Sequence, residues 1–288
     1  MLGPPDTVRQ RLRAWVRQGA DWTSPESQPF DVTGCFAPLL RWIIRGWQGE
    51  PRVVLALDAT AQCDRLLALV VSVVYRGCAL PVAWAILPAN QKGAWLPAEL
   101  QLLTYLSPAV PADWTVLVTT DRGLWSPTLW RRIRALGWHP LMRVRRETTF
   151  APAGGMRQAA RHFVSGPGQA WIGPGAAFKH HAKRLPSTLL VVWLDDQDEP
   201  WIVLTDLPPE QVGVTWYGLR VWIEGGFRVL KRLGWQWQNT RRTDPPRVER
   251  HWLVLAVSTL IVLRYGTRAE DAAALGLPPG HLHRARAL

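Results

Sequence analysis

Apolar and polar positions follow two different periods along this chain, and together the periods predict a mixed α/β fold. Three apolar runs rich in β-branched residues follow one another closely, with Arg76 and Gly77 between the second and the third. These runs are VVLALD (53–58), LLALVVSVVY (66–75) and ALPVAWAIL (79–87). Such a succession predicts an antiparallel meander of three strands.

The following residues alternate between helical spacing and short apolar runs. Helical spacing predicts helices over 94–107 and 126–137, and the second has a Ser126 cap, Pro127 at its start and Gly137 at its end. Strands are predicted at 115–121 and 140–145. Residues 146–213 are rich in Gly and Pro with strand-like runs at 187–194 and 201–207, which indicates a β-rich insertion. Helical spacing returns over 216–235 and again near 246–265.

The order of these elements resembles that of a ribonuclease-H-like fold, with a mixed five-stranded sheet, flanking helices and a β-rich insertion. We expect five segments, of which the first is short and helical and the last is a loosely held tail. They are the N-terminal segment (1–48), the first part of the core (49–145), the insertion (146–213), the second part of the core (214–265) and the tail (266–288).

Charge and composition limit the classes of partner that this chain is expected to bind. The 288 residues carry a formal net charge of +12, which favours a polyanion such as nucleic acid, with an anionic membrane surface as the rival. The N-terminus has no long apolar stretch of the signal-peptide kind, and the apolar run 252–263 is too short to span a bilayer. The 3 cysteines fit no metal-ligand spacing. We therefore expect a soluble, cytoplasmic protein without a membrane partner.

Two acids stand at special positions in this pattern. Asp58 ends the first predicted strand and Asp121 ends the fourth. If these strands are neighbours, their carboxylates converge at one edge of the sheet. Two close carboxylates repel unless a proton or cation lies between them, and Mg²⁺ suits that place. Taken alone, each aspartate is more commonly an ordinary strand-end residue.

The predicted helix over 216–235 carries a polar stripe. At about 100° per residue, its members fall within an arc of about 80°. They are Tyr217, Arg220, Glu224, Arg228 and Lys231. Ordinary solvation explains such a stripe, and so does a metal-binding glutamate beside bases that contact a phosphate backbone.

The spacing of four of these residues is specific. Tyr217, Arg220, Glu224 and Lys231 reproduce the YREK signature of the insertion-sequence-4 family of DDE transposases, which the chain resembles over roughly 50–265. Further segments are similar to that family: LALDAT, LPANQKGAW, TTDRGLWSP, LWRRIRALGWHPLMRVRR and EPWIVLTDLP.

The resemblance implies a function. Asp58, Asp121 and Glu224 would be catalytic and hold two Mg²⁺ ions, for which Mn²⁺ can substitute, while Tyr217, Arg220, Lys231 and the neighbouring Arg228 would contact DNA. Water would first free a 3′-hydroxyl, which would then attack the other strand or target DNA. The substrates would be double-stranded terminal inverted repeats and target DNA, bound by a homodimer.

Two other readings stay open. Only 57 residues precede Asp58, whereas many relatives carry a longer helical region that recognises the transposon ends. The chain could therefore be a truncated or domesticated DNA-binding remnant without catalysis. A basic membrane-associated protein is the other alternative, against which the absence of an amphipathic or spanning segment argues.

Three further features carry less weight. The acidic cluster of Asp195, Asp196 and Asp198 is interpreted as a hairpin turn before a metal site, because a strand-like run precedes it and Pro200 follows. His180 and His181 belong to a basic loop that fits DNA contact or solvation equally. For Trp125, packing beneath the sheet is favoured over stacking on a displaced DNA base.

Overall fold

A computed structural model describes residues 5–17, 30–62, 64–89, 95–180, 183–213 and 216–274. Its contacts divide the chain into two units. The larger spans Thr33–Pro245 and contains the whole sheet, and the smaller combines Met1–Val32 with Pro246–Leu288.

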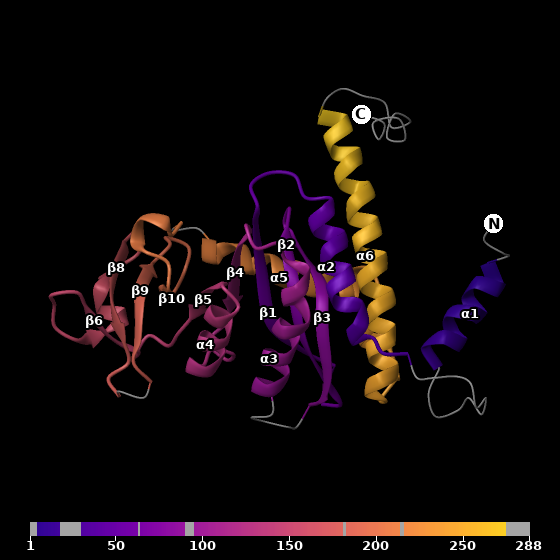
Figure 1. The fold of residues 1–288 in the computed structure, drawn as a ribbon, viewed down its shortest axis with the longest axis horizontal. Helices are drawn as coiled ribbons and strands as arrows, with labels where there is room; N and C mark the ends of the chain where they lie inside the picture. Colours follow the sequence, from indigo (N-terminus) through magenta and orange to yellow (C-terminus); the bar gives the residue numbers. More distant parts are fainter. Residues whose placement is uncertain are drawn as a thin grey trace. The chain divides into compact units, whose positions relative to one another are not determined.

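The larger unit is built on one sheet of ten strands in the order β3-β2-β1-β4-β5-β10-β9-β8-β6-β7 (Figure 1). The strands are β1 (Arg52–Gln62), β2 (Leu66–Tyr75), β3 (Cys78–Pro88), β4 (Thr115–Thr120), β5 (His139–Arg143), β6 (Thr149–Pro152), β7 (Gln158–Ala159), β8 (Ala170–Ala177), β9 (Leu185–Val192) and β10 (Trp201–Thr205). Among the described strands, the pairs β1–β4 and β4–β5 are parallel, and the other pairs are antiparallel.

The predicted meander is present as β1, β2 and β3, and β4 lies directly beside β1, as the convergence of the two acids requires. The structure differs from the expected five-stranded sheet in one respect. Strands β6–β10, which lie within the expected insertion, continue the same sheet because β10 pairs with β5. Lateral pairing of this kind joins residues far apart in sequence, and local hydrophobic spacing does not encode it.

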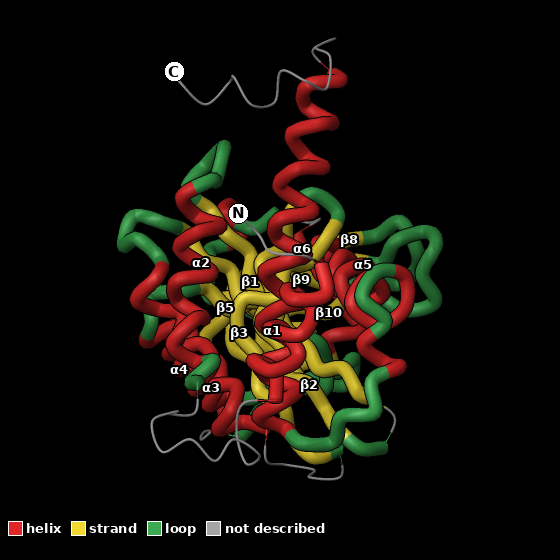
Figure 2. Tube along the Cα trace, turned by 90° about the vertical axis from the view of Figure 1, so that its right-hand side faces the viewer, coloured by secondary structure: helices red, strands yellow, loops and turns green. Residues whose placement is uncertain are grey.

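Helices cover both faces of the sheet. Figure 2 shows α3 and α4 on one side of the strands and α5 on the other. The α-helices of this unit are α2 (Phe36–Arg45), α3 (Trp95–Leu106), α4 (Pro127–Ala135) and α5 (Val221–Arg228). Ser126 caps α4 as expected, since its hydroxyl accepts from the Leu129 amide at 3.0 Å. Short helical turns are η1 (Thr33–Cys35), η2 (Ser107–Ala109), η3 (Ala160–Phe163), η5 (Pro209–Gln211) and η8 (Trp237–Asn239).

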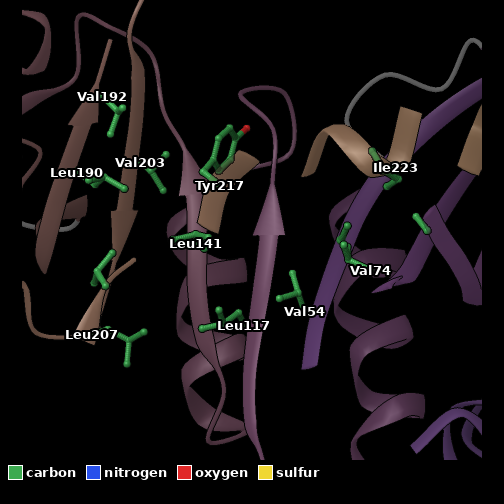
Figure 3. Close-up of a cluster of buried hydrophobic side chains, with 13 residues drawn as sticks. Val54, Val74, Leu117, Leu141, Leu190, Val192, Val203, Leu207, Tyr217 and Ile223 are labelled. Carbon is green, nitrogen blue, oxygen red and sulfur yellow. The ribbon is translucent and has the colours of Figure 1, made fainter. Parts of the chain in front are cut away.

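A buried apolar cluster joins the sheet to the segment before and within α5. In Figure 3 its side chains run across successive strands, from Val192 on β9 to Val74 on β2. Strand alternation places Val54 and Ala56 on this face, where Ile223 of α5 joins the cluster. Asp58, two residues after Ala56 on β1, therefore faces the same segment before and within α5.

The predicted helix over 216–235 is not one regular α-helix. It begins as a 3₁₀ turn, η6 (Trp216–Arg220), continues as α5 and ends as a π turn, η7 (Val229–Leu233). A constant 100° per residue therefore does not describe its polar stripe, because the two flanking helix types advance by different angles. Gly226 explains the tight packing of α5, since a Cβ at this position would lie 2.6 Å from the Ala79 carbonyl oxygen.

The smaller unit contains α1 (Pro5–Arg17) and α6 (Pro245–Ala274). The buried Arg250 guanidinium donates to the Val16 carbonyl through two nitrogens, each at 3.2 Å. Helix α6 continues to Ala274, so residues 266–274 of the expected tail are helical, and residues 275–288 lie outside the described part.

The length of α6 also changes the reading of the apolar run 252–263. Residues Pro245–Ala272 are long and apolar enough, with mean hydropathy 1.2, to cross a membrane. Core helices of soluble proteins meet the same criterion, so one such helix is weak evidence. The expected absence of a membrane partner therefore stays a prediction.

Candidate active site

The sheet brings the two predicted aspartates to one place. Asp121 directly follows β4, as expected, whereas Asp58 lies within β1 rather than at its end. The β1–β2 hairpin pairs on to Gln62, so β1 continues four residues past Asp58. Leu57 is paired with Thr120, so each aspartate is the next residue along two neighbouring parallel strands. Both therefore emerge at the same level of the sheet, as the sequence predicted.

Arg220 holds the two aspartates together. Its Nη2 donates to Asp58 Oδ2 at 2.6 Å and lies 3.8 Å from Asp121 Oδ2. The Arg220 side chain is 15% exposed and the Asp58 side chain 13%. This charge-assisted hydrogen bond joins two largely buried side chains and is therefore stronger than a surface ion pair. The Arg220 guanidinium thus lies at the position where repulsion between the Asp58 and Asp121 carboxylates favours a positive charge.

Backbone amides fix the Asp121 carboxylate in the loop that follows β4. Its Oδ1 accepts from the amides of Gly123 at 2.7 Å and Leu124 at 3.2 Å. Because Oδ1 is occupied in this way, Oδ2 is the oxygen that lies toward Arg220. The side chain is 38% exposed, so Asp121 is the more accessible of the two acids.

The surroundings of Asp58 disfavour the ionised form of its carboxyl group. Burial raises the pKa of this carboxyl above its ordinary value, and the charges of Asp121 and Glu224 act in the same direction. The Arg220 guanidinium and the Ala59 amide, which donates to Oδ1 at 2.8 Å, act to lower the pKa. Three acids therefore influence one another here, and a cation lowers their repulsion.

Glu224 is exposed and lies on α5, four residues after Arg220. It is close enough for its charge to act on Asp58. Within the described residues, no three His, Cys, Asp or Glu side chains form a group arranged to hold a metal ion. Arg228 is exposed at the end of α5, and Lys231 is half-buried in the π turn.

Tyr217 differs from the expected phosphate contact. The residue is 3% exposed, and its hydroxyl donates to the Thr120 carbonyl oxygen at 3.4 Å. Burial, as the largest cause, raises the pKa of Tyr217 to about 12. The Tyr217 ring also packs edge-on against Trp201. Here the tyrosine anchors η6 to the end of β4, next to Asp121, and its hydroxyl would have to move to meet a phosphate.

Sequence reasoning missed Glu99 of α3. Glu99 is 3% exposed, and burial together with the Asp121 charge raises its pKa to about 7. A cavity of about 340 Å³ lies beside it, lined by Trp95, Leu96, Glu99, Gly123, Leu124, Trp125 and Ser126. A signal existed, because Glu99 falls three and four residues before the buried Leu102 and Leu103.

The structure also shows where Trp125, the acidic segment 195–199 and His180 lie. Trp125 stacks on Phe178, with ring centroids 4.7 Å apart and planes 6° apart. The DDQDE segment (195–199) connects β9 to β10, as predicted for a hairpin turn. His180 is exposed in the bend after β8, while His181 lies outside the described residues.

The donor chemistry fits a divalent cation at the aspartate pair. Carboxylate oxygens are the hard ligands that Mg²⁺ prefers, and those of Asp58 and Asp121 already surround one positive charge. A cation bound there would take the place of the Arg220 guanidinium. Glu224 is the nearby acid that could join them after a side-chain movement, because its charge already reaches Asp58.

The family model described as the transposase DDE domain matches residues 73–261, a range that includes Asp121 and Glu224 and begins after Asp58. No curated protein matches. Among solved structures, the chain is similar to the piggyBac transposase in its synaptic complex with hairpin DNA, at 11% identity and a TM-score of 0.40. That match covers 79% of this chain and 48% of the other, so the chain spans about half of its length.

Proposed function

The chain belongs to the family of transposase DDE domains, and from this premise we propose that it cuts and joins DNA strands at the ends of a mobile element. Asp58, Asp121 and Glu224 are the proposed catalytic acids. Within the family we assign the chain to the insertion-sequence-4 group, on the spacing of Tyr217, Arg220, Glu224 and Lys231. The strand order β3-β2-β1-β4-β5 supports a ribonuclease-H-like core.

One observation carries the proposal. Asp58 and Asp121 share the guanidinium of Arg220, which lies 162 residues from Asp58 in sequence. The segment that supplies this arginine also supplies Glu224, whose charge acts on Asp58. Two acids on neighbouring parallel strands with a third beside them form the donor set that phosphoryl-transfer chemistry uses.

Asp58, Asp121 and Glu224 would hold the divalent cation, and we expect two Mg²⁺ ions, which Mn²⁺ can replace. Bound there, they would stabilise charge on the attacking and leaving oxygens of the phosphodiester. The chain itself supplies the position of the acids, through the β1–β4 register and the amides of Gly123 and Leu124.

Arg220 has a second role in this proposal. Once its charge is no longer needed between the acids, its guanidinium is free to bind two phosphate oxygens of the substrate. Exposed Arg228 and half-buried Lys231 would hold the DNA backbone without reading its sequence. Tyr217 would position Arg220 by anchoring η6 to the Thr120 carbonyl. We further expect the protein to act as a homodimer that joins two ends.

The experiment that tests the proposal is cleavage of DNA carrying the element's own ends. The intact chain is compared with Glu224→Gln and with the matched control Glu210→Gln, which changes an exposed acid of η5. We expect nicking that requires Mg²⁺ or Mn²⁺, is abolished in E224Q and is retained in E210Q. DNA binding without nicking by the intact chain would refute catalysis, and nicking by E224Q would refute the role of Glu224.

A further inference from the structure

A positively charged side chain lies level with the two aspartates, at the same edge of the sheet. Thr120 of β4 is paired with Leu57 of β1 and with Met142 of β5, and these three strands run parallel. The residues that follow these three positions are Asp121, Asp58 and Arg143. Arg143, the last residue of β5, is therefore one strand away from Asp121.

Arg143 also lies on the same face of the sheet as the acids. Leu141, two residues earlier on β5, belongs to the buried cluster on the face that α5 covers (Figure 3). Strand alternation returns the Arg143 side chain to this face. Burial raises the pKa of Tyr217, and the charges of Arg220 and Arg143 act against that rise. Arg143 is therefore close to the same turn, η6, that supplies Arg220.

One carboxylate joins Arg143 to a second arginine. Glu199 Oε1 lies 3.2 Å from Arg143 Nη2 and 2.8 Å from Arg122 Nη1. Arg122 directly follows Asp121, while Glu199 belongs to the turn between β9 and β10. Two guanidinium groups from different parts of the chain thus meet at one carboxylate oxygen. We name Arg122 and Arg143 the arginine pair.

The contacts of the arginine pair with Glu199 can be exchanged. The side chains of Glu199 and Arg122 are 35% and 46% exposed. Ion pairs this accessible to solvent contribute little to stability, because water and salt screen them. Within the described residues, Glu199 is the acid that forms ion pairs with the arginine pair, so two positive groups share one negative group. The three side chains together keep a positive charge that attracts an anion.

We propose that the arginine pair binds a DNA phosphate beside the scissile one, and that Glu199 occupies the place of this phosphate in the free chain. This inference rests on the proposed function. Carboxylate and phosphate oxygens both match the planar fork of a guanidinium group, so a phosphate can replace Glu199. DNA binding then breaks two ion pairs, and Glu199 lowers the affinity for DNA.

The sheet register predicts which phosphate is bound. Neighbouring strands lie ~4.8 Å apart, and successive phosphates along one DNA strand are separated by a rise of ~3.4 Å. The arginine pair is one strand away from Asp121, on the side opposite to Asp58. We therefore expect it to meet the first or the second phosphate next to the one held by the acids. Arg220 differs from the pair, because its guanidinium lies between the acids themselves.

The test measures binding of fluorescent duplexes that carry the element's own end to the full chain. Anisotropy is recorded at one salt concentration in a buffer with a chelator, so that binding is observed without cleavage. The variant is Glu199→Gln, with Glu199→Ala as a second change that also removes the charge. Asp198→Asn is the matched control, because it removes the charge of the exposed neighbouring acid in the same turn. Circular dichroism checks that each variant is folded.

We expect Glu199→Gln and Glu199→Ala to bind the duplex about fivefold more tightly than the intact chain. Each exposed ion pair that DNA must break accounts for a factor of about 1.4–5. Asp198→Asn should remain close to the intact chain. In a background with Arg122→Gln and Arg143→Gln, the change at Glu199 should have no more effect than the change at Asp198.

A second measurement locates the phosphate. Duplexes are made in which one phosphate is replaced by an uncharged methylphosphonate, either at the first or second position beside the cut or about eight nucleotides away. The tighter binding of Glu199→Gln should disappear with one of the two near substitutions and persist with the distant one. Persistence with both near substitutions would show that the arginine pair does not bind at the predicted position.

Other outcomes overturn the proposal in distinguishable ways. An equal gain in Asp198→Asn would indicate general electrostatic attraction. Weaker binding by Glu199→Gln would show that Glu199 positions the arginines and does not compete with DNA. Unchanged affinity in both Glu199 variants, with metal-dependent nicking that still requires Glu224, would remove this inference and leave the proposed function standing. Absence of DNA binding by the intact chain and by Glu199→Gln would remove the proposed function as well.

Discussion

The substitution Glu99→Gln gives the clearest physical test of the site's surroundings. Glu99 is 3% exposed and, within the described residues, has no hydrogen-bond or ion-pair partner. Burial, followed by the charge of Asp121, raises its pKa from 4.5 to about 7. Glutamine has the shape of the protonated acid and carries no charge at any pH, so the variant removes the ionisation alone.

The magnitude follows from linkage between protonation and folding. One pKa unit corresponds to about 1.36 kcal/mol, so this displacement corresponds to roughly 3 kcal/mol. The folded protein keeps a proton that the unfolded chain releases, so the wild-type free energy of unfolding falls as pH rises from about 4.5 to about 7. Below that window the variant and the wild type should be equally stable. At pH 8 the variant should be more stable by about 3 kcal/mol.

Urea unfolding at pH 4.5, 6, 7 and 8 measures this difference, in a buffer with a chelator so that no cation compensates the acids. Glu210→Gln, a change of an exposed acid, is the control and should show no such dependence. A stability difference that stays constant from pH 4.5 to 8 would refute the reasoning. A variant less stable than the wild type at pH 8 would show that the Glu99 charge has a partner.

Two further predictions concern the segment that carries the arginine. Arg220→Gln leaves the Asp58 carboxylate, which is 13% exposed, without its cation, so thermal unfolding in chelator should show a loss of stability of about 1–3 kcal/mol. Added Mg²⁺ should restore more stability to the variant than to the wild type. Equal gains would contradict the idea that Mg²⁺ and the Arg220 guanidinium compete for one position. Gly226→Ala should destabilise by about 1–3 kcal/mol, because the new Cβ would lie 2.6 Å from the Ala79 carbonyl oxygen. Gly225→Ala, whose nearest neighbour is at 3.5 Å, is its matched control in the same denaturant assay, and equal losses would contradict the packing argument.

Local sequence pattern predicted the parts of the site that depend on strand and spacing. Asp58 and Asp121 belong to the first and fourth apolar runs, and their convergence was predicted on the condition that these runs are neighbouring strands, as they are in the structure. The length of β1 did not follow, because Gln62 and its neighbours are less apolar and belong to the strand through pairing with β2. The roles assigned to Tyr217 and Glu224 stay predictions.

Features that depend on tertiary packing were harder to predict from the sequence. The change from 3₁₀ to α to π geometry around Glu224 accompanies the close approach of Gly226 to Ala79, a residue on β3. The pairing of β10 with β5 joins residues about 60 apart, and hydrophobic spacing carries no information on it. Glu99 was missed because an acid within an otherwise apolar helix face looks locally like a solvated residue.

The wide sequence separation within the acid site has a consequence during biosynthesis. Asp58 and Asp121 emerge from the ribosome well before Arg220, which is 162 residues after the first of them. At about 5–20 residues per second, the 99 residues between Asp121 and Arg220 take roughly 5–20 s to synthesise. During that interval the nascent chain has two acids and neither the arginine nor Glu224. A nascent chain that ends before Glu224 therefore cannot assemble the proposed centre, and every strand of the described sheet has been synthesised by that point.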